Sequence, residues 1–350
     1  MLQKENQQIF VIQYLRGIAA ILVVLFHSTM MTAVAPFYTH HFGSIGVDLF
    51  FVISGFVMWT ATSGLQRGPI LFWRARVFRI APMYWIATLT FVAVTYFLPS
   101  ALLHPRTFDV AHILKSLFFI PSNNISVNAI VPTYTIGWTL NYEMFFYFIF
   151  GLSLLIKNCT FRAISVAATL ILICTFGKNF PANPIISFYS NPVLMEFIAG
   201  MFIAINRKKF FELSEKYGAL LLLLSMGFIV SSYDRAGFSW LNVLGCTLLV
   251  AGSLPFESIV QSKSNKFFVL IGDASYSIYL FHGFFQRALF IILGGKIASL
   301  ADAVIYSVLA LLIGTIGGIL TYQMIERPII RMLKIRVTKV KTLSTNRIEA

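Results

Sequence analysis

The sequence predicts an all-α membrane protein: a polytopic bundle of about ten transmembrane helices with both termini in the cytoplasm. Of its 350 residues, 58% are hydrophobic and only 11% are charged, whereas a soluble protein of this size carries a far more polar surface. Apolar runs close to twenty residues long recur along the whole chain, and this is the length of a helix that crosses a bilayer. The short alternating segments of a membrane β-barrel do not occur.

The expected spans, in chain order, are residues 12–33, 45–62, 80–99, 136–156, 160–176, 187–205, 217–231, 238–254, 274–294 and 302–324. The first is interpreted as a span rather than a cleaved signal peptide, because its apolar run is longer than the core of a signal. Residues 110–120, "VAHILKSLFFI", are too short to cross and are expected to lie at the interface or re-enter. The three cysteines have no metal or redox spacing and are interpreted as small packing residues.

The distribution of basic residues supports this topology. With the termini inside, 21 of the 27 Lys and Arg fall on inner segments, five fall on outer loops, and Arg287 lies within a span. The net charge of +14 then indicates loops that face anionic membrane lipid, not nucleic acid. We expect one integral-membrane domain over residues 1–330, followed by a basic cytoplasmic tail over residues 331–350.

Three ionisable residues are expected at one depth near the outer side of the membrane. His27 lies in the outer third of the first span, eleven residues and roughly 16 Å of helical rise beyond Arg16. Asp48 lies just below the outer surface in the second span, and Glu143 about 10 Å below it in the fourth. Isolated charges in hydrocarbon are costly, so such residues normally face a cavity or one another.

We therefore predict a catalytic group of His27, Asp48 and Glu143, in which the Asp48 carboxylate orients the imidazole and stabilises its charged form. His27 would act as a general base or form a covalent acyl-histidine, and we favour the base. The structural alternatives are a helix–helix hydrogen bond for His27 and a Trp or Tyr partner for Glu143.

Arginines gather at the inner side, where "FWRARVFRIAPMYW" carries Arg74, Arg76 and Arg79, and Arg16 is expected at a similar depth. Positive-inside bias explains any one of them. Four together, interleaved with aromatic residues, favour a phosphorylated, adenine-bearing ligand from the cytoplasm, because guanidinium groups bind phosphate bidentately and stack on flat rings. The sequence has no Walker or GxGxxG pattern, and no metal is expected.

Other polar residues lie within later spans. Glu196 and Arg287 are a plausible buried ion pair, and His282 lies five residues before Arg287 in the ninth span. Glu326, in the closing "MIERP", is interpreted as part of a helix terminus.

Six stretches, in this order, resemble the integral-membrane acyltransferase-3 family, whose members O-acylate surface glycans: "LRGIAAILVVLFH", "GVDLFFVISGFVM", "FWRARVFRIAPMYW", "GWTLNYEMFFY", "SYSIYLFH" and "ERP". They cover nearly the whole chain, and the fourth is closest to exopolysaccharide-acetylating members. The resemblance implies about ten spans and acetyl-CoA or a related acyl-CoA as co-substrate. The family's essential histidine and arginines would fall on His27, Arg16, Arg74 and Arg76, with Asp48 and Glu143 as further motif positions.

The leading hypothesis is thus an enzyme of the bacterial plasma (inner) membrane that moves an acyl group, acetyl in the first instance, from acyl-CoA to a sugar hydroxyl of a surface glycan or lipid-linked oligosaccharide. The alternatives are a transporter of an anionic solute or glycolipid, with His27 and the carboxylates as a proton relay, and an acyltransferase that acts on lipid or protein. Repeat symmetry, which would favour the transporter, is not found. The sequence leaves a homo-oligomer open.

Overall fold

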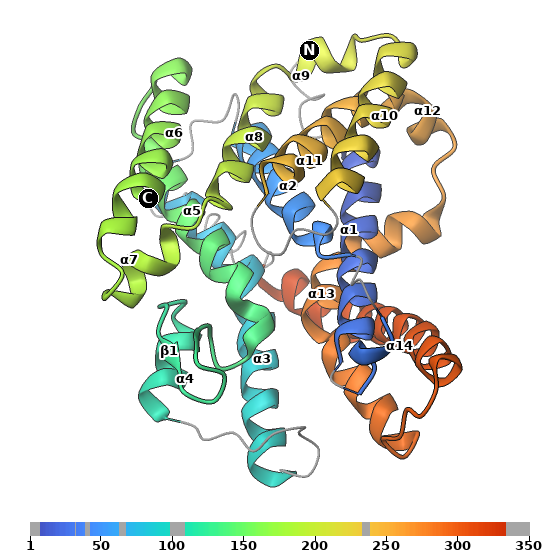
Figure 1. Cartoon of the computed structure of the whole chain (residues 1–350). Coiled ribbons are helices and arrows are strands. Elements are labelled where there is room, and N and C mark those ends of the chain that lie inside the picture. The colour runs from blue at the N-terminus through green and yellow to red at the C-terminus, as the bar shows by residue number, and fades with distance from the viewer. Residues whose placement is uncertain are drawn as a thin grey trace, which may run out of the picture.

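The computed structural model describes residues 8–31, 33–38, 43–62, 68–98, 109–232 and 239–333. Within these ranges the chain is a bundle of α-helices with one two-stranded antiparallel ladder (Figure 1). The helices are α1 (Phe10–Met30), α2 (Ile45–Thr62), α3 (Pro69–Phe97), α4 (Val110–Leu117), α5 (Trp138–Ser153), α6 (Cys159–Phe176), α7 (Pro184–Tyr189), α8 (Leu194–Ile205), α9 (Arg207–Phe211), α10 (Glu215–Ser232), α11 (Trp240–Ser253), α12 (Glu257–Ser262), α13 (Lys266–Ile292) and α14 (Leu300–Thr321). The strands are β1 (Asn123–Asn124) and β2 (Ala129–Ile130), and a π-helical turn, Tyr322–Glu326, follows α14.

The predicted all-α membrane bundle is confirmed. Each expected span coincides with helical residues, and eight helical segments of the described chain are long and apolar enough to cross a membrane. The other two expected spans are shorter than predicted: α5 has 16 residues, and the segment at 187–205 is divided between α7 and α8, which has 12. The cytoplasmic position of the termini and the single-domain division stay predictions, and most of the basic tail lies outside the described residues.

Helix α3 begins eleven residues earlier than the expected span at residue 80. It starts at Pro69, and proline is well suited to the first turn of a helix because its missing N–H group has no intrahelical partner there. The basic segment is therefore helical. Residues 76 and 79, three apart, share a face of this helix, whereas residue 74 projects about 200° away from residue 76.

Helices α1 and α13 run side by side in the same direction at the centre of the bundle (Figure 1). Near their starts, a Cβ atom on Gly272 would lie 2.2 Å from the backbone oxygen of Gln13, so only glycine permits this approach. Further along, the Gln286 side chain donates to the backbone oxygen of Val24 at 2.9 Å. The two helices thus stay in contact over several turns, and polar residues on their facing sides meet.

A second close helix pair is formed by α2 and α8. A Cβ atom on Gly55 would lie 2.1 Å from the backbone oxygen of Phe197, and one on Gly200 would lie 1.9 Å from that of Val52. Small residues at such contacts let backbones approach in membrane bundles, where packing replaces the hydrophobic drive between helices. This pair fixes α2, which carries Asp48 and Ser54, against the rest of the bundle.

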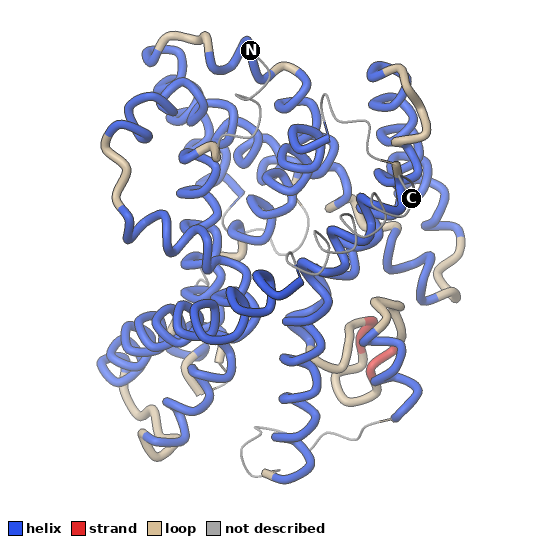
Figure 2. The backbone as a smooth tube through the Cα atoms, turned by 180° about the vertical axis from the view of Figure 1, so that it is seen from behind, coloured by secondary structure: helices blue, strands red, loops and turns tan. Residues whose placement is uncertain are grey.

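A small lobe of α4 and the two-stranded ladder lies beside the second half of α3 (Figures 1 and 2). Asp109 caps α4 by accepting a hydrogen bond from a backbone N–H group. The Tyr84 and Trp85 side chains of α3 donate to backbone oxygens of residues 116 and 117 at 3.1 and 2.8 Å. With eight residues, α4 is too short to cross a bilayer, as predicted for residues 110–120.

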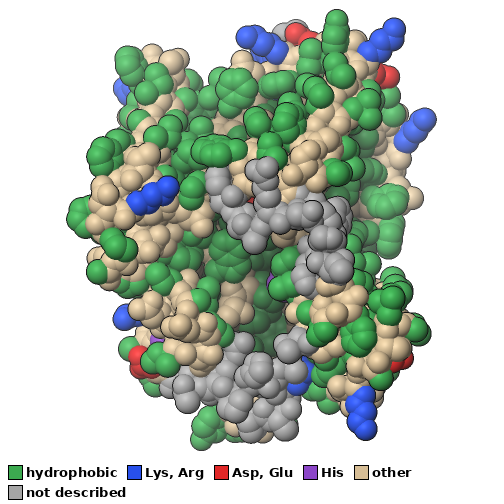
Figure 3. All heavy atoms as spheres, viewed as in Figure 1, with side chains coloured by type: hydrophobic (Ala, Val, Ile, Leu, Met, Phe, Trp, Pro, Cys, Tyr) green, Lys and Arg blue, Asp and Glu red, His purple; other side chains and the backbone are tan. Residues whose placement is uncertain are grey.

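The surface is dominated by apolar side chains. In Figure 3, hydrophobic side chains are spread over the whole visible face, charged side chains lie mainly at its periphery, and the face is hollowed near its middle. Large apolar residues such as Leu223 and Ile292 are 71% and 80% exposed. Such an apolar surface is suited to contact with lipid.

Candidate active site

A cavity lies between α1, α2, α3, α5 and α13, and it collects most of the charged residues in the middle of the bundle. Its charged lining residues are Arg16 from α1, Arg76 and Arg79 from α3, and Glu143 from α5. Aromatic, aliphatic, serine and threonine side chains complete its walls. Its volume is about 160 Å³. Pockets that enclose a drug-sized molecule measure roughly 300–1,000 Å³, so this one takes a narrow part of a ligand.

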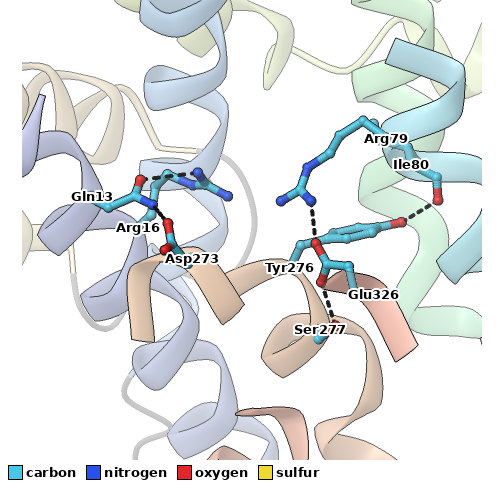
Figure 4. A network of polar contacts seen from close by, with 8 residues as sticks. All are labelled: Gln13, Arg16, Arg79, Ile80, Asp273, Tyr276, Ser277 and Glu326. Atoms are coloured by element: carbon cyan, nitrogen blue, oxygen red, sulfur yellow. Dashed lines mark hydrogen bonds and ion pairs between the residues drawn. The ribbon is translucent and has the colours of Figure 1, made fainter. Parts of the chain in front are cut away.

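Arg16 and Arg79 extend toward one another from opposite walls of this cavity (Figure 4). Arg16 donates to the Gln13 side chain at 3.3 Å, and Gln13 in turn donates to Asp273 of α13. Arg79 forms an ion pair with Glu326, so the end of the chain's last span contributes a charge at the edge of the site. Each guanidinium is therefore held by contacts that leave it directed into the cavity.

Glu326 is completely buried and is bonded on both sides. Its second carboxylate oxygen accepts a hydrogen bond from Ser277 at 2.5 Å. The neighbouring Tyr276 donates to the backbone oxygen of Ile80 at 2.7 Å, and its ring lies 5.7 Å from the Arg79 guanidinium carbon. Interpretation of Glu326 as a plain helix terminus missed this role. Its carboxylate neutralises the charge of Arg79 in the cavity. Glu326 lies in a π-helical turn, and such turns often mark functional positions.

Arg76 also lines the cavity, with its guanidinium carbon 5.7 Å from the Phe72 ring. Its Nε atom and the Ser275 hydroxyl are buried and have no hydrogen-bond partner among the described residues. Buried polar atoms are nearly always paired, so these two atoms are available to bind a polar ligand.

Arg74 does not line this cavity, which corrects the prediction that it joins the other three arginines. Its side chain is exposed, and its guanidinium carbon lies 5.4 Å from the Phe78 ring. The reason is helical geometry: Arg74 and Arg76 are two residues apart on a continuous helix and project in nearly opposite directions.

Glu143 lies with the arginines rather than with His27, which corrects the prediction of a shared outer depth. Its carboxylate accepts hydrogen bonds from Ser54 at 3.2 Å and from Tyr147, one turn further along α5. It lines the same cavity as Arg16. Helix tilt and the short length of α5 make a depth estimate from residue counting unreliable here.

Asp48 is also separate from His27, contrary to the prediction that it orients the imidazole. Its carboxylate accepts a hydrogen bond from Asn242 at 3.0 Å and lies within hydrogen-bonding reach of Glu196. Glu196 is completely buried and has no other hydrogen-bond partner among the described residues. The expected Glu196–Arg287 pair is therefore wrong, because the neighbour of Glu196 is a second carboxyl group.

The partner of His27 is another histidine. The rings of His27 and His282, on the parallel helices α1 and α13, have centroids 4.8 Å apart. The His27 Nδ1 atom lies 2.9 Å from the backbone oxygen of Val23, and the His282 Nδ1 atom lies 3.1 Å from that of Ile278. A carbonyl only accepts, so each neutral ring carries its proton on Nδ1 and presents a lone pair on Nε2.

Tyr279 lies between the cavity and the histidines. It lines the cavity, and its ring centroid is 6.5 Å from that of His282. Its hydroxyl is held by Thr139 and by the backbone oxygen of Ile136, both at 2.7 Å. The cationic cavity and the imidazole pair are thus neighbouring parts of one region.

Within the described ranges, no group of three or more His, Cys, Asp or Glu residues is placed to hold a metal ion. The expectation that the enzyme uses no metal stays a prediction.

Comparison with known proteins identifies the family of this chain. The family model described as "Acyltransferase domain" matches residues 9–322. The chain is 34% identical over 322 residues to "Exopolysaccharide production protein ExoZ" of Rhizobium meliloti (strain 1021), covering 88% of this chain and 95% of that protein. It is 23% identical to "Acyltransferase MdmB" of Streptomyces mycarofaciens, covering 83% of this chain and 82% of the relative. No solved structure matches. The chain therefore belongs to this acyltransferase family, and it is a multi-pass membrane acyltransferase.

Proposed function

We propose that this enzyme transfers an acyl group, acetyl in the first instance, from acyl-CoA to a hydroxyl group of an exported polysaccharide or its lipid-linked precursor. The acceptor class is supported by the name of ExoZ, a protein of exopolysaccharide production that aligns with 88% of this chain. We place the enzyme in the bacterial plasma membrane, with the donor site open to the cytoplasm.

The cavity between α1, α3 and α13 is the main support for the choice of donor. Arg16, Arg76 and Arg79 line it, and Glu143 is its one acidic lining residue among those described. Guanidinium groups bind phosphate oxygens through charge-assisted, often bidentate hydrogen bonds. The unpaired Nε of Arg76 and the free hydroxyl of Ser275 supply further donors. An anionic, phosphate-bearing ligand satisfies all of these groups.

The small volume of the cavity suits the shape of acyl-CoA. We place the diphosphate and the thin pantetheine arm within it and the bulkier adenosine toward the cytoplasmic mouth. The arm would point past Tyr279 toward His27, whose α-carbon lies about three helical turns, roughly 16 Å, along α1 from that of Arg16. The thioester would then reach the imidazole pair while the arginines hold the phosphates.

At that point His27 acts on the acceptor. A sugar hydroxyl is a poor nucleophile at neutral pH and needs a base within hydrogen-bond reach. The contact of His27 Nδ1 with the Val23 carbonyl fixes the tautomer and leaves the Nε2 lone pair free for this task. As the hydroxyl oxygen attacks the thioester carbon, its proton passes to Nε2. The C–S bond then breaks, and the CoA thiolate leaves and takes up one proton.

Purified enzyme in sealed vesicles tests the proposal. Acetyl-CoA carrying a labelled acetyl group is supplied with or without an oligosaccharide acceptor from an exopolysaccharide. We expect acceptor-dependent release of CoA and labelled ester on the acceptor, with weaker or no transfer from longer acyl-CoAs. A rate of CoA release that is the same with and without the glycan would contradict the proposed acceptor. Acetylation only of lipid or protein would contradict it as well.

A further inference from the structure

His282 is a buried histidine that lies beside the proposed catalytic base, His27. Its side chain is completely buried, and its Nε2 atom has no hydrogen-bond partner among the described residues. An unpaired buried polar atom destabilises the fold, which favours a functional reason for its presence. The nearest ionisable neighbour is His27, whose ring centroid is 4.8 Å away.

Among the residues that the structure describes, no charged group surrounds the two rings. Phe26 packs edge-on against His27, and Tyr279 lies on the other side of His282, with its hydroxyl already bonded to Thr139. Among the described residues, no carboxylate contacts either imidazole, and Asp48 is held by Asn242. A proton taken up by His27 would therefore create a cation with no acidic partner.

The tautomers of His27 and His282 allow the two rings to hold an added proton without a carboxylate partner. With both Nδ1 atoms directed to backbone oxygens, both Nε2 atoms are acceptors, so two neutral rings have no proton to share between these atoms. One added proton turns one Nε2 atom into a donor for the other. The two neutral rings thus lack the one proton that a hydrogen bond between their Nε2 atoms needs. The reaction proposed for this site delivers that proton.

We propose that His282 is a second catalytic histidine, which shares with His27 the proton removed from the acceptor hydroxyl. The proton passes from the hydroxyl oxygen to His27 Nε2, is shared with His282 Nε2 directly or through one water, and returns to the departing CoA thiolate. Each cycle consumes acyl-CoA and alcohol and releases ester and CoA, so no further reactant is needed. The role rests on the proposed function.

The test compares two acceptors on the His282→Gln variant, which preserves most of the side-chain volume but cannot carry the proton. The first acceptor is the glycan, whose hydroxyl needs a base. The second is hydroxylamine, a strong nucleophile that needs little base assistance. We expect kcat for the glycan to fall at least about tenfold. KM for acetyl-CoA and the rate with hydroxylamine should stay within about twofold of the wild type.

His112→Gln is the matched control, because the Nε2 atom of His112 is also buried and unpaired but lies in the α4 lobe. It should leave both rates unchanged. Equal losses with both acceptors in His282→Gln, a loss of acetyl-CoA binding, or unchanged glycan transfer would each overturn the proposal. Failure of the wild-type enzyme to acetylate any glycan would instead refute the proposed function.

Discussion

Arg79 and Glu326 form an ion pair that joins the first half of α3 to the end of the last span, across 247 residues of sequence. Glu326 is completely buried, whereas the Arg79 side chain is 31% exposed and reaches the cavity. The pair closes one side of the proposed donor site and connects its cationic wall to the closing "ERP" of the sequence.

Glu326→Gln should destabilise the protein, because it leaves the Arg79 charge without its buried partner. We expect the free energy of unfolding to fall by about 1–3 kcal/mol, less than for a fully buried pair because Arg79 can be partly rehydrated. Thermal unfolding in detergent measures the change. Glu212→Gln, on an exposed residue, is the control. A double variant with Arg79→Gln should recover part of the loss, and strict additivity of the two single losses would argue against the pair.

Arg76 and Arg74 should differ sharply in donor binding, although only one residue separates them. Arg76→Ala removes a guanidinium from the cavity wall and should weaken acetyl-CoA binding at least about tenfold, and Arg76→Lys should restore little of it. Arg74→Ala, on the exposed side of α3, should change the affinity less than about threefold, since a solvated charge contributes little. Calorimetry in detergent measures both, and equal losses would show that the donor occupies a different surface of α3.

Asp48→Asn tests whether Asp48 serves His27 or the packing of α2 against α8 and α11. The amide supplies an N–H donor to Glu196, which has no donor among the described residues. We expect stability to be kept or raised and acetyl transfer to stay within about threefold of the wild type. Asp48→Leu, which cannot bond Asn242, should lower stability. A tenfold fall in kcat for Asp48→Asn at unchanged KM would restore the orienting role predicted from the sequence.

Gly55→Ala should separate α2 from α8. The added Cβ atom would lie 2.1 Å from the backbone oxygen of Phe197, which cannot move without shifting its helix. We expect a loss of about 1–3 kcal/mol, the usual cost of overpacking. Gly227→Ala, where no atom lies within 4 Å of the new Cβ, should leave the unfolding temperature nearly unchanged. Equal stability of the two variants would contradict the close helix contact.

The sequence predicts the helical spans well because each apolar run carries its own length signal. It also predicts that Arg16, Arg76 and Arg79 come together. It does not predict which face of α3 meets the cavity, because the helix start at Pro69 could not be placed from hydropathy. With that start known, the three-residue spacing of Arg76 and Arg79 would have excluded Arg74.

The partners of the buried polar residues were predicted less well. Depth counted along separate helices placed His27, Asp48 and Glu143 together, but tilt and rotation are set by packing, not by sequence position. Small residues set that packing at Gly272 and Gly55. His282 was visible in "SYSIYLFH", but a histidine in an apolar helix gives no sign of its partner until α1 and α13 are known to be parallel neighbours.

The most direct test of the account measures acetyl-CoA binding and acetyl transfer on one preparation of His27→Ala. The arginine cavity is proposed to bind the donor and His27 to remove the proton, so the two activities should separate. We predict affinity for acetyl-CoA within about threefold of the wild type and a fall in glycan acetylation of at least about a hundredfold. Transfer that stays above half of the wild-type rate, with the donor still bound, would contradict the assignment of proton removal to His27.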